Sequence, residues 1–182
     1  IRDYRLQFEY QSLKTYAPDV MIVVPQLDNL LSWHGMHFVR VGEYKVANLK
    51  FRLEIPPNYP ARGPDVFFND EVAHILINPE TKQLNLDPMF PVWNPRRHNI
   101  VGILGYIYRI FEDCHDLEVS YAMNTSLMTL YLDSKHDYLE IVRKTVSHSQ
   151  VNVFHSDPES PLKARYGIFS CPRQIVEMDK SD

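Results

Sequence analysis

The stretch that decides the fold runs from Ile55 to Pro95. It opens with Ile-Pro-Pro-Asn-Tyr-Pro-Ala-Arg-Gly-Pro-Asp-Val-Phe-Phe at 55–68, continues with His-Ile-Leu-Ile-Asn-Pro-Glu-Thr-Lys-Gln-Leu-Asn-Leu-Asp at 74–87 and closes with Trp-Asn-Pro at 93–95. Prolines crowd this stretch, and each one fixes φ and removes a backbone hydrogen-bond donor. We therefore expect a long, ordered connection that is packed on its own aromatic side chains. Long loops inside compact domains usually carry function.

Hydrophobic periodicity predicts the regular elements before this stretch and at its start. Residues 1–16 place Leu6, Tyr10 and Leu13 at helical spacing, which predicts an amphipathic helix that ends before Pro18. The segment 42–47 has the composition of a turn between two strands. Four apolar or alternating segments are expected to pair as an antiparallel meander, namely residues 21–24, 31–39, 49–55 and 66–68.

Three further helices are predicted after the proline-rich stretch. Residues 99–111 carry an apolar stripe typical of a central helix, and its glycines, Gly102 and Gly105, indicate a close approach to the sheet. Asn124 has the chemistry of an N-cap, and Ser134 with Asp137 has the spacing of a capping box. The fold class is therefore α+β. We expect one domain over residues 1–157, followed at 158–182 by an extended arm that packs on it, with mobile last residues.

Composition excludes several classes of protein. Of the 182 residues, 45% are hydrophobic and 12% aromatic, which argues against a disordered chain. The formal net charge of −4, with both signs mixed, gives no broad basic face, so direct nucleic-acid binding is not expected. No run of 18 apolar residues predicts a membrane span, and no signal-peptide pattern is present. Two distant cysteines, Cys114 and Cys171, favour a reducing compartment, cytosol or nucleus.

Histidines and cysteines give no convincing reactive or metal-binding group. His34 and His37 are three residues apart on a predicted strand, so their side chains should point to opposite faces. His148 and His155 could share a helical face, but no third ligand is evident. Cys114 is adjacent to a histidine, yet neighbouring residues at a helix end point in different directions, and we interpret both cysteines as structural thiols. No metal and no cofactor are expected.

The proline-rich stretch resembles the signature of the ubiquitin-conjugating enzyme (E2) family. That family has a Pro-x-x-Tyr-Pro turn, then His-Pro-Asn, an active cysteine within about a dozen residues, and Trp-x-Pro before a long helix. The positions that carry the resemblance here are Pro56, Tyr59, Pro60, Pro64, His74, Trp93 and Pro95. The resemblance implies the ubiquitin-conjugating (UBC) fold: an N-terminal helix, a four-stranded antiparallel meander, a central helix and two C-terminal helices.

The resemblance fails at the positions that carry E2 chemistry. With one residue of extra loop, Asn85 takes the place of the cysteine, and without that residue the place falls to Leu84. Neither side chain can form a thioester with ubiquitin. Leu76 stands where the family has the asparagine that is thought to stabilise the oxyanion, and leucine has no donor. His74 is expected to tie the loop to nearby backbone. The resemblance thus implies an inactive E2 variant.

Two surfaces are candidates for binding a partner. The expected C-terminal helices carry more apolar side chains than a narrow core stripe needs. These side chains either belong to the core or form a groove for a partner helix. The candidates on this surface are Tyr131, Leu132, Tyr138, Leu139 and Val142. The basic pair Arg96 and Arg97, just before the central helix, has two interpretations, a solvated loop or a surface for an acidic partner or phosphate.

Within the E2 family, the chain is most similar to the fused-toes or Akt-interacting protein (AKTIP) group, to which the fly telomere protein Pendolino belongs. The similarity is carried by the run at 31–44 and by Asn-Pro-x-Thr at 78–81. It implies a non-catalytic scaffold that assembles with Hook proteins and a Hook-interacting (FHIP-type) partner to link vesicles to dynein, or that serves telomere protection with lamins, in the cytoplasm or the nucleus. The alternative is a regulatory variant that binds ubiquitin or an active E2.

Overall fold

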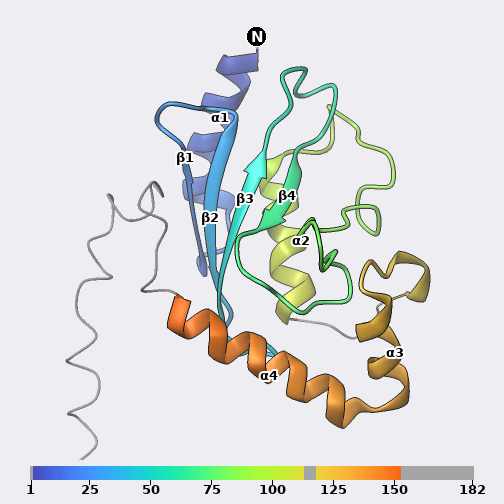
Figure 1. Cartoon of the computed structure of the whole chain (residues 1–182). Helices are drawn as coiled ribbons and strands as arrows, with labels where there is room; N and C mark the ends of the chain where they lie inside the picture. Colours follow the sequence, from blue (N-terminus) through green and yellow to red (C-terminus); the bar gives the residue numbers. More distant parts are fainter. Residues whose placement is uncertain (1, 113–117, 153–182) are drawn as a thin grey trace, which may run out of the picture.

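The computed structural model describes residues 2–112 and 118–152 (Figure 1). Helix α1 is followed by a four-stranded antiparallel sheet in the order β1-β2-β3-β4, and then by helices α2, η1, α3 and α4. The bounds are α1 Arg2–Tyr16, β1 Met21–Pro25, β2 Ser32–Phe38, β3 Asn48–Glu54, β4 Asp65–Phe68, α2 Ile100–Glu112, the 3-10 turn η1 Val119–Tyr121, α3 Thr125–Asp133 and α4 Lys135–Asn152. This arrangement confirms the predicted α+β class and the meander.

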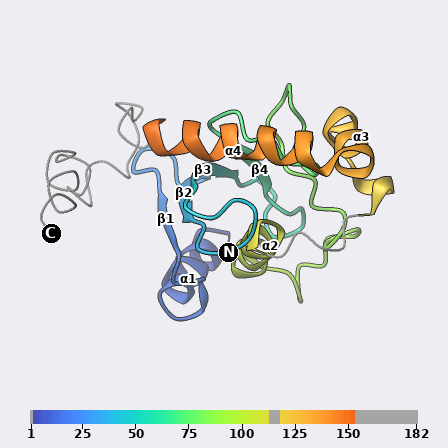
Figure 2. The same cartoon turned by 90° about the horizontal axis from the view of Figure 1, so that it is seen from below.

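The core lies between the sheet and the helices α1 and α2. Figure 2 shows both helices on one side of the sheet and α4 along the other side. Alternation places Trp33, Phe51 and Phe68 on the side of α1 and α2, where all three are buried. Gly35 is required here because a Cβ at this position would lie 2.2 Å from the Phe51 ring. The expected close approach at Gly102 and Gly105 is wrong, since an added Cβ would meet only ordinary contacts or open space there.

The turn between β2 and β3 is held to the end of α2 by one carboxylate. The two oxygens of Glu112 accept hydrogen bonds from the backbone N–H groups of Arg40 and Val41, each at 3.0 Å. Gly42 follows with φ of +81°, and a Cβ there would lie 3.0 Å from the carbonyl oxygens of Phe111 and Glu112. Glycine is therefore the residue that this turn needs.

The C-terminal helices begin at the predicted caps. The Asn124 side chain accepts a hydrogen bond from Leu127 N–H at 3.0 Å, which confirms it as the N-cap of α3. At the start of α4 a hydrogen bond from the Ser134 side chain lowers the pKa of the Asp137 carboxyl, so the two predicted residues lie together there. At the junction of the two helices, the Lys135 ammonium lies 4.4 Å from the Tyr131 ring centre and 4.7 Å from that of Tyr138.

Several predicted features lie outside the described residues. They are Cys114, Cys171, His155 and the arm at 158–182. Within the described ranges, no group of three potential metal-ligating side chains occurs. None of the helices described is long and apolar enough to cross a bilayer.

Candidate functional site

The first half of the proline-rich stretch is anchored on a buried carboxylate. Glu9 is only 3% exposed, although it belongs to α1. It accepts hydrogen bonds from the Tyr59 hydroxyl, from Arg5 Nε at 2.7 Å and from the N–H of Ile100 at 2.8 Å. Burial, with the neighbouring Glu9, raises the pKa of Tyr59 well above its ordinary value. Glu9 thereby joins α1, the Tyr-Pro turn and the N-terminus of α2 at one point.

The indole of Trp93 closes this half of the stretch. Its Nε1–H donates to the carbonyl of Pro60 at 2.8 Å. A Cβ at Gly63 would lie 2.5 Å from the indole, so the glycine allows the ring to approach the backbone closely. Of the other predicted signature residues, Pro56 and Pro64 are buried and Pro95 is exposed. The signature therefore marks a packed turn that positions the start of α2.

His74 ties the second half of the stretch to the end of α2. The ring donates through Nε2 to the carbonyl of Ile110 at 3.1 Å and accepts at Nδ1 from the N–H of Leu76 at 3.1 Å. Burial lowers the pKa of His74 to about 4, so the ring is neutral at pH 7. Both nitrogens are engaged with backbone, which leaves neither for proton transfer.

The two candidates for the cysteine position face different surroundings. Leu84 is 2% exposed and belongs to the core, whereas the next residue, Asn85, is half-buried. Asn85 Nδ2 donates to the carbonyl of Tyr121 at 3.0 Å, and its Oδ1 accepts from the N–H of Asp87 at 2.9 Å. The Asn85 amide thus holds η1 against the loop with both of its polar atoms.

The backbone around Asn85 is fixed as firmly as its side chain. Its N–H donates to the carbonyl of Leu76 at 2.8 Å, and its carbonyl accepts from the Tyr106 hydroxyl at 3.0 Å. Burial raises the pKa of Tyr106 above its ordinary value, so this hydroxyl stays protonated as a donor. Leu76 itself is 2% exposed and packs in the core.

Sequence reasoning missed Glu9, Tyr106 and Tyr121. Glu9 had a signal, because an acid between Leu6 and Leu13 interrupts the buried stripe of α1. Tyr106 lies in the apolar stripe of α2 and gave no sign that its hydroxyl would reach Asn85. Tyr121 contributes its backbone carbonyl as the acceptor for Asn85, and its side-chain type gives no indication of that role. The hydrogen bonds of Asn85 within the described residues are to backbone groups and to the Tyr106 hydroxyl, and both cysteines of the chain lie outside the described residues.

Comparison with known proteins agrees with this geometry. A sequence profile described as "Ubiquitin-conjugating enzyme" matches residues 5–146. The chain belongs to the ubiquitin-conjugating enzyme family. The match covers the sheet, α2 and most of α4, so the expected UBC fold and the expected family are both confirmed.

Similar curated proteins place the chain among unusual members of the family. A crossbronx homolog of Anopheles gambiae is 27% identical over 158 residues, which cover 85% of this chain and 69% of the relative. An AKTIP homolog of Nematostella vectensis is 26% identical over 164 residues, covering 88% of this chain and 54% of the relative. The crossbronx protein of Drosophila ananassae is 23% identical, with 86% of this chain covered. These names support the predicted E2 variant of the fused-toes group.

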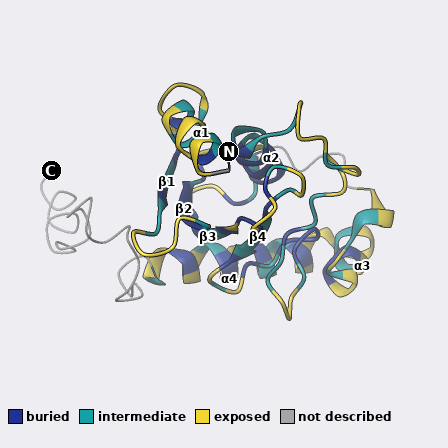
Figure 3. Ribbon diagram, turned by 90° about the horizontal axis from the view of Figure 1, so that it is seen from above, coloured by how far each residue is buried: buried dark blue, intermediate teal, exposed yellow. Residues whose placement is uncertain are grey.

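The expected partner surface of this E2 variant needs correction. Tyr138 and Val142 are 1% and 0% exposed and belong to the core, because they lie on the side of α4 that faces the sheet and α3. Figure 3 shows buried positions alternating with exposed ones along α4. Tyr131 and Leu139 are half-buried, and only Leu132 is well exposed. The apolar excess thus mainly joins α3 to α4.

The basic pair is exposed, whereas the two strand histidines lie against other side chains. Arg96 and Arg97 are both exposed on the loop before α2. His37 is fully buried against Phe111 and lies 3.6 Å from a Glu112 oxygen, while His34 lies next to Gln26. Burial lowers the pKa of His37 to about 4.

Proposed function

We propose that this chain is a non-catalytic E2 variant that works by binding other proteins in a larger assembly. The observation that carries the proposal is the state of Asn85, which we assign to the position of the family's cysteine. An amide is no nucleophile, and this one has both polar atoms in hydrogen bonds, one to Tyr121 of η1 and one to Asp87 of the same loop. The position has become part of the scaffold.

The second support is the lack of a donor at the oxyanion position. We assign that position to Leu76, whose side chain is buried and apolar. Removing one oxyanion donor typically costs about 10²–10³ in rate. A nucleophile brought to Asn85 would therefore still lack stabilisation for the developing charge.

The partners that we propose are those of the fused-toes group, because curated relatives carry the names AKTIP homolog and crossbronx. A coiled-coil adaptor of the Hook type, with its FHIP-type interacting protein, would place the chain in dynein-linked vesicle transport in the cytoplasm. Telomere-capping or lamin partners would place it in the nucleus. The chain spans 54% to 74% of the length of the relatives named crossbronx homolog and AKTIP homolog.

A thioester assay tests the absence of catalysis. The chain is incubated with activating enzyme, ubiquitin and ATP, beside an active E2 as the positive control, and the products are separated without reductant. We expect no reducible ubiquitin adduct on this chain. An adduct that disappears in Cys114→Ser or Cys171→Ser would overturn the proposal.

Affinity capture from cell extract tests the partner class. Coiled-coil motor adaptors or telomere proteins among the specific partners support the scaffold. Capture of ubiquitin and an active E2 instead would replace it with the regulatory alternative, in which an inactive variant positions an active enzyme.

A further inference from the structure

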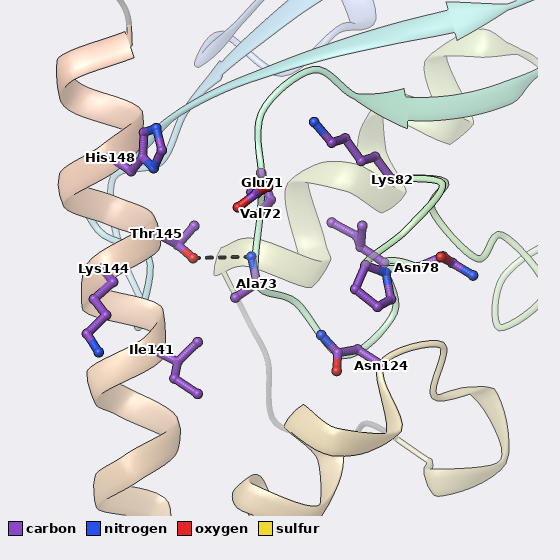
Figure 4. A pocket seen from close by; sticks show the side chains of 12 residues that line it. Glu71, Val72, Ala73, Asn78, Lys82, Asn124, Ile141, Lys144, Thr145 and His148 are labelled. Atoms are coloured by element: carbon purple, nitrogen blue, oxygen red, sulfur yellow. Dashed lines mark hydrogen bonds between the residues drawn. The ribbon is translucent and has the colours of Figure 1, made fainter.

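A cleft of about 300 Å³ opens between α4 and the loop that leads from β4 to Asn85 (Figure 4). Its floor is apolar, with Val72 and Ile77 from the loop and Ile141 from α4. Within the cleft the N–H of Ala73 donates to Thr145 Oγ1 at 3.1 Å, which joins the loop to α4. Figure 4 shows lining residues on both sides of this bond, His148 on one side and Ile141 and Asn124 on the other.

The rim of the cleft is rich in hydrogen-bond donors. Lys82 and Lys144 contribute ammonium groups, and His148 lies one turn beyond Lys144 on α4. Glu71 is the one carboxylate that lines the cleft. Two ammonium groups against one carboxylate leave the lining with a formal charge of +1, histidine counted as neutral, in a chain whose formal net charge is −4. This local sign favours a negatively charged ligand over a positively charged one.

Two rim donors are fixed in place by the fold. The Asn124 oxygen accepts from Leu127 N–H as the cap of α3, so its amide nitrogen is turned outward, and Figure 4 shows that nitrogen on the side nearer α4. Lys82 has φ of +61°, its N–H donates to the Asn78 carbonyl at 2.8 Å, and its Nζ donates to the Asn69 carbonyl at 3.2 Å. Pre-set donors reduce the entropy that a ligand loses on binding.

We propose that this cleft binds an extended acidic segment of a partner protein, with carboxylates on the rim and an aliphatic side chain on the floor. Carboxylates are acceptors only, which matches a rim of ammonium and amide donors. The apolar floor between Val72 and Ile141 distinguishes a peptide from a small anion, because an inorganic anion would leave that floor in water. Asn85, Leu76 and Tyr106 do not line the cleft, so the inference stands whether or not a thioester forms.

The test uses the full chain and a fluorescein-labelled peptide, Gly-Leu-Asp-Glu-Leu-Asp-Gly. We expect saturable binding with a Kd below about 1 mM and NMR shifts at the amides of Asn78, Lys82, Asn124 and Lys144. The matching neutral peptide, Gly-Leu-Asn-Gln-Leu-Asn-Gly, should bind at least tenfold more weakly, about the effect of losing a few exposed ion pairs. Equal binding of the two peptides would overturn the proposal.

Two matched double variants locate the site on α4. Lys144→Glu with His148→Glu reverses the rim charge, and we expect about a tenfold rise in the Kd of the acidic peptide. Arg143→Glu with Ser147→Glu changes the net charge equally on exposed positions of the same helix that do not line the cleft, and should leave the Kd within twofold. All four positions are exposed, so both proteins should keep the melting temperature of the parent within a few degrees. Equal weakening by the two variants would show only long-range charge and would refute the site.

Two further outcomes would also overturn the proposal of an acidic-segment site. Inorganic phosphate that shifts the same amides at the same concentrations as the peptide would show a simple anion site. Asp157→Asn with Glu159→Gln in the full chain removes acids that follow α4 in sequence. If that change tightens peptide binding by more than threefold, the cleft belongs to the chain's own segment; we expect no change.

Discussion

The two halves of the proline-rich stretch differ in whether they keep the residue that is typical of the family. At Tyr59, the side chain typical of the family is present and holds the turn to Glu9 and the start of α2. At Asn85, which we assign to the cysteine position, an amide instead holds the loop to Tyr121. Both halves are tied by hydrogen bonds of similar geometry, although one keeps the family's residue and the other does not.

The comparison teaches that the two parts of an enzyme signature depend on different physics. Tyr59 and Trp93 are required for packing whether or not the protein reacts, because burial and hydrogen bonds position α2. A nucleophile adds rate and little stability, and active sites often hold residues that are unfavourable for folding. Once the reaction is not needed, such a position is free to accept a stabilising side chain.

The sharpest way to break the comparison is to remove the anchor of the first half. Glu9→Ala leaves the buried Tyr59 hydroxyl and the Ile100 N–H without their acceptor, so we expect a loss of about 3 kcal/mol in the free energy of unfolding, measured with urea. Glu9→Gln keeps an acceptor and should cost less than half as much. A loss below about 1 kcal/mol for Glu9→Ala would show that the node does not organise the fold.

Acid should weaken the second half through its buried histidine. Burial lowers the pKa of His74 to about 4, against about 6.5 in the unfolded chain, so the unfolded state binds more protons between these values. Stability is therefore full at pH 7 and is lost as pH falls from about 6.5 toward 4, by about 2 kcal/mol at pH 4.5. His37, with its pKa also lowered to about 4, adds a similar loss.

The variant His74→Gln separates the two contributions. It should be less stable than the parent at pH 7, because glutamine does not reproduce both backbone hydrogen bonds of the ring. Its loss between pH 7 and pH 4.5 should be smaller than that of the parent by about 2 kcal/mol, in urea titrations at matched ionic strength. An unchanged loss would show that His74 is not the group that titrates.

Substitutions at Asn85 measure how much its side chain contributes to the free energy of unfolding. Asn85→Ala removes the bonds to Tyr121 and Asp87, and we expect a cost of about 1.5 kcal/mol. Asn85→Cys should cost about as much and should transfer no ubiquitin in the assay above, since Leu76 offers no donor. Robust transfer by that single variant would refute the assignment of Leu76.

The smallest loss of stability is expected at Asn124, the N-cap of α3, whose backbone is bonded to the second half of the proline-rich stretch. Asn124→Ala removes the side-chain acceptor of Leu127 N–H, while the backbone N–H of Asn124 still donates to Ile75. We expect a cost of about 1 kcal/mol. Thr129→Ala, on the exposed face of the same helix, should change stability by less than about 0.5 kcal/mol.

The sequence predicted what depends on local pattern. Alternating apolar and polar residues located the strands, and apolar stripes located the helices. Asn124 indicated the start of α3 because its side chain is a favoured N-cap. The partner surface was predicted less well, because the apolar residues along α4 do not show which of them α3 and the sheet will bury. Tyr138 and Val142 are buried, whereas Leu132 is exposed.

The contacts of the candidate site could not be predicted from the sequence. The resemblance to the E2 signature pointed to Asn85, Leu76 and His74, but it did not indicate what holds them. The partners of Asn85 lie 36 residues away at Tyr121 and 21 residues away at Tyr106, and no local pattern encodes such separations. The cleft escaped notice for the same reason, since its basic rim combines Lys82 with Lys144 from another element.

The hydrogen bonds of Asn85 also bear on which sequence changes this position tolerates. On the proposed assignment, a mutation of Asn85 to cysteine gives up two hydrogen bonds at once, whereas efficient chemistry would still require a donor in place of Leu76. Any single-step path from this sequence to a reactive one therefore passes through a less stable intermediate that has gained little rate.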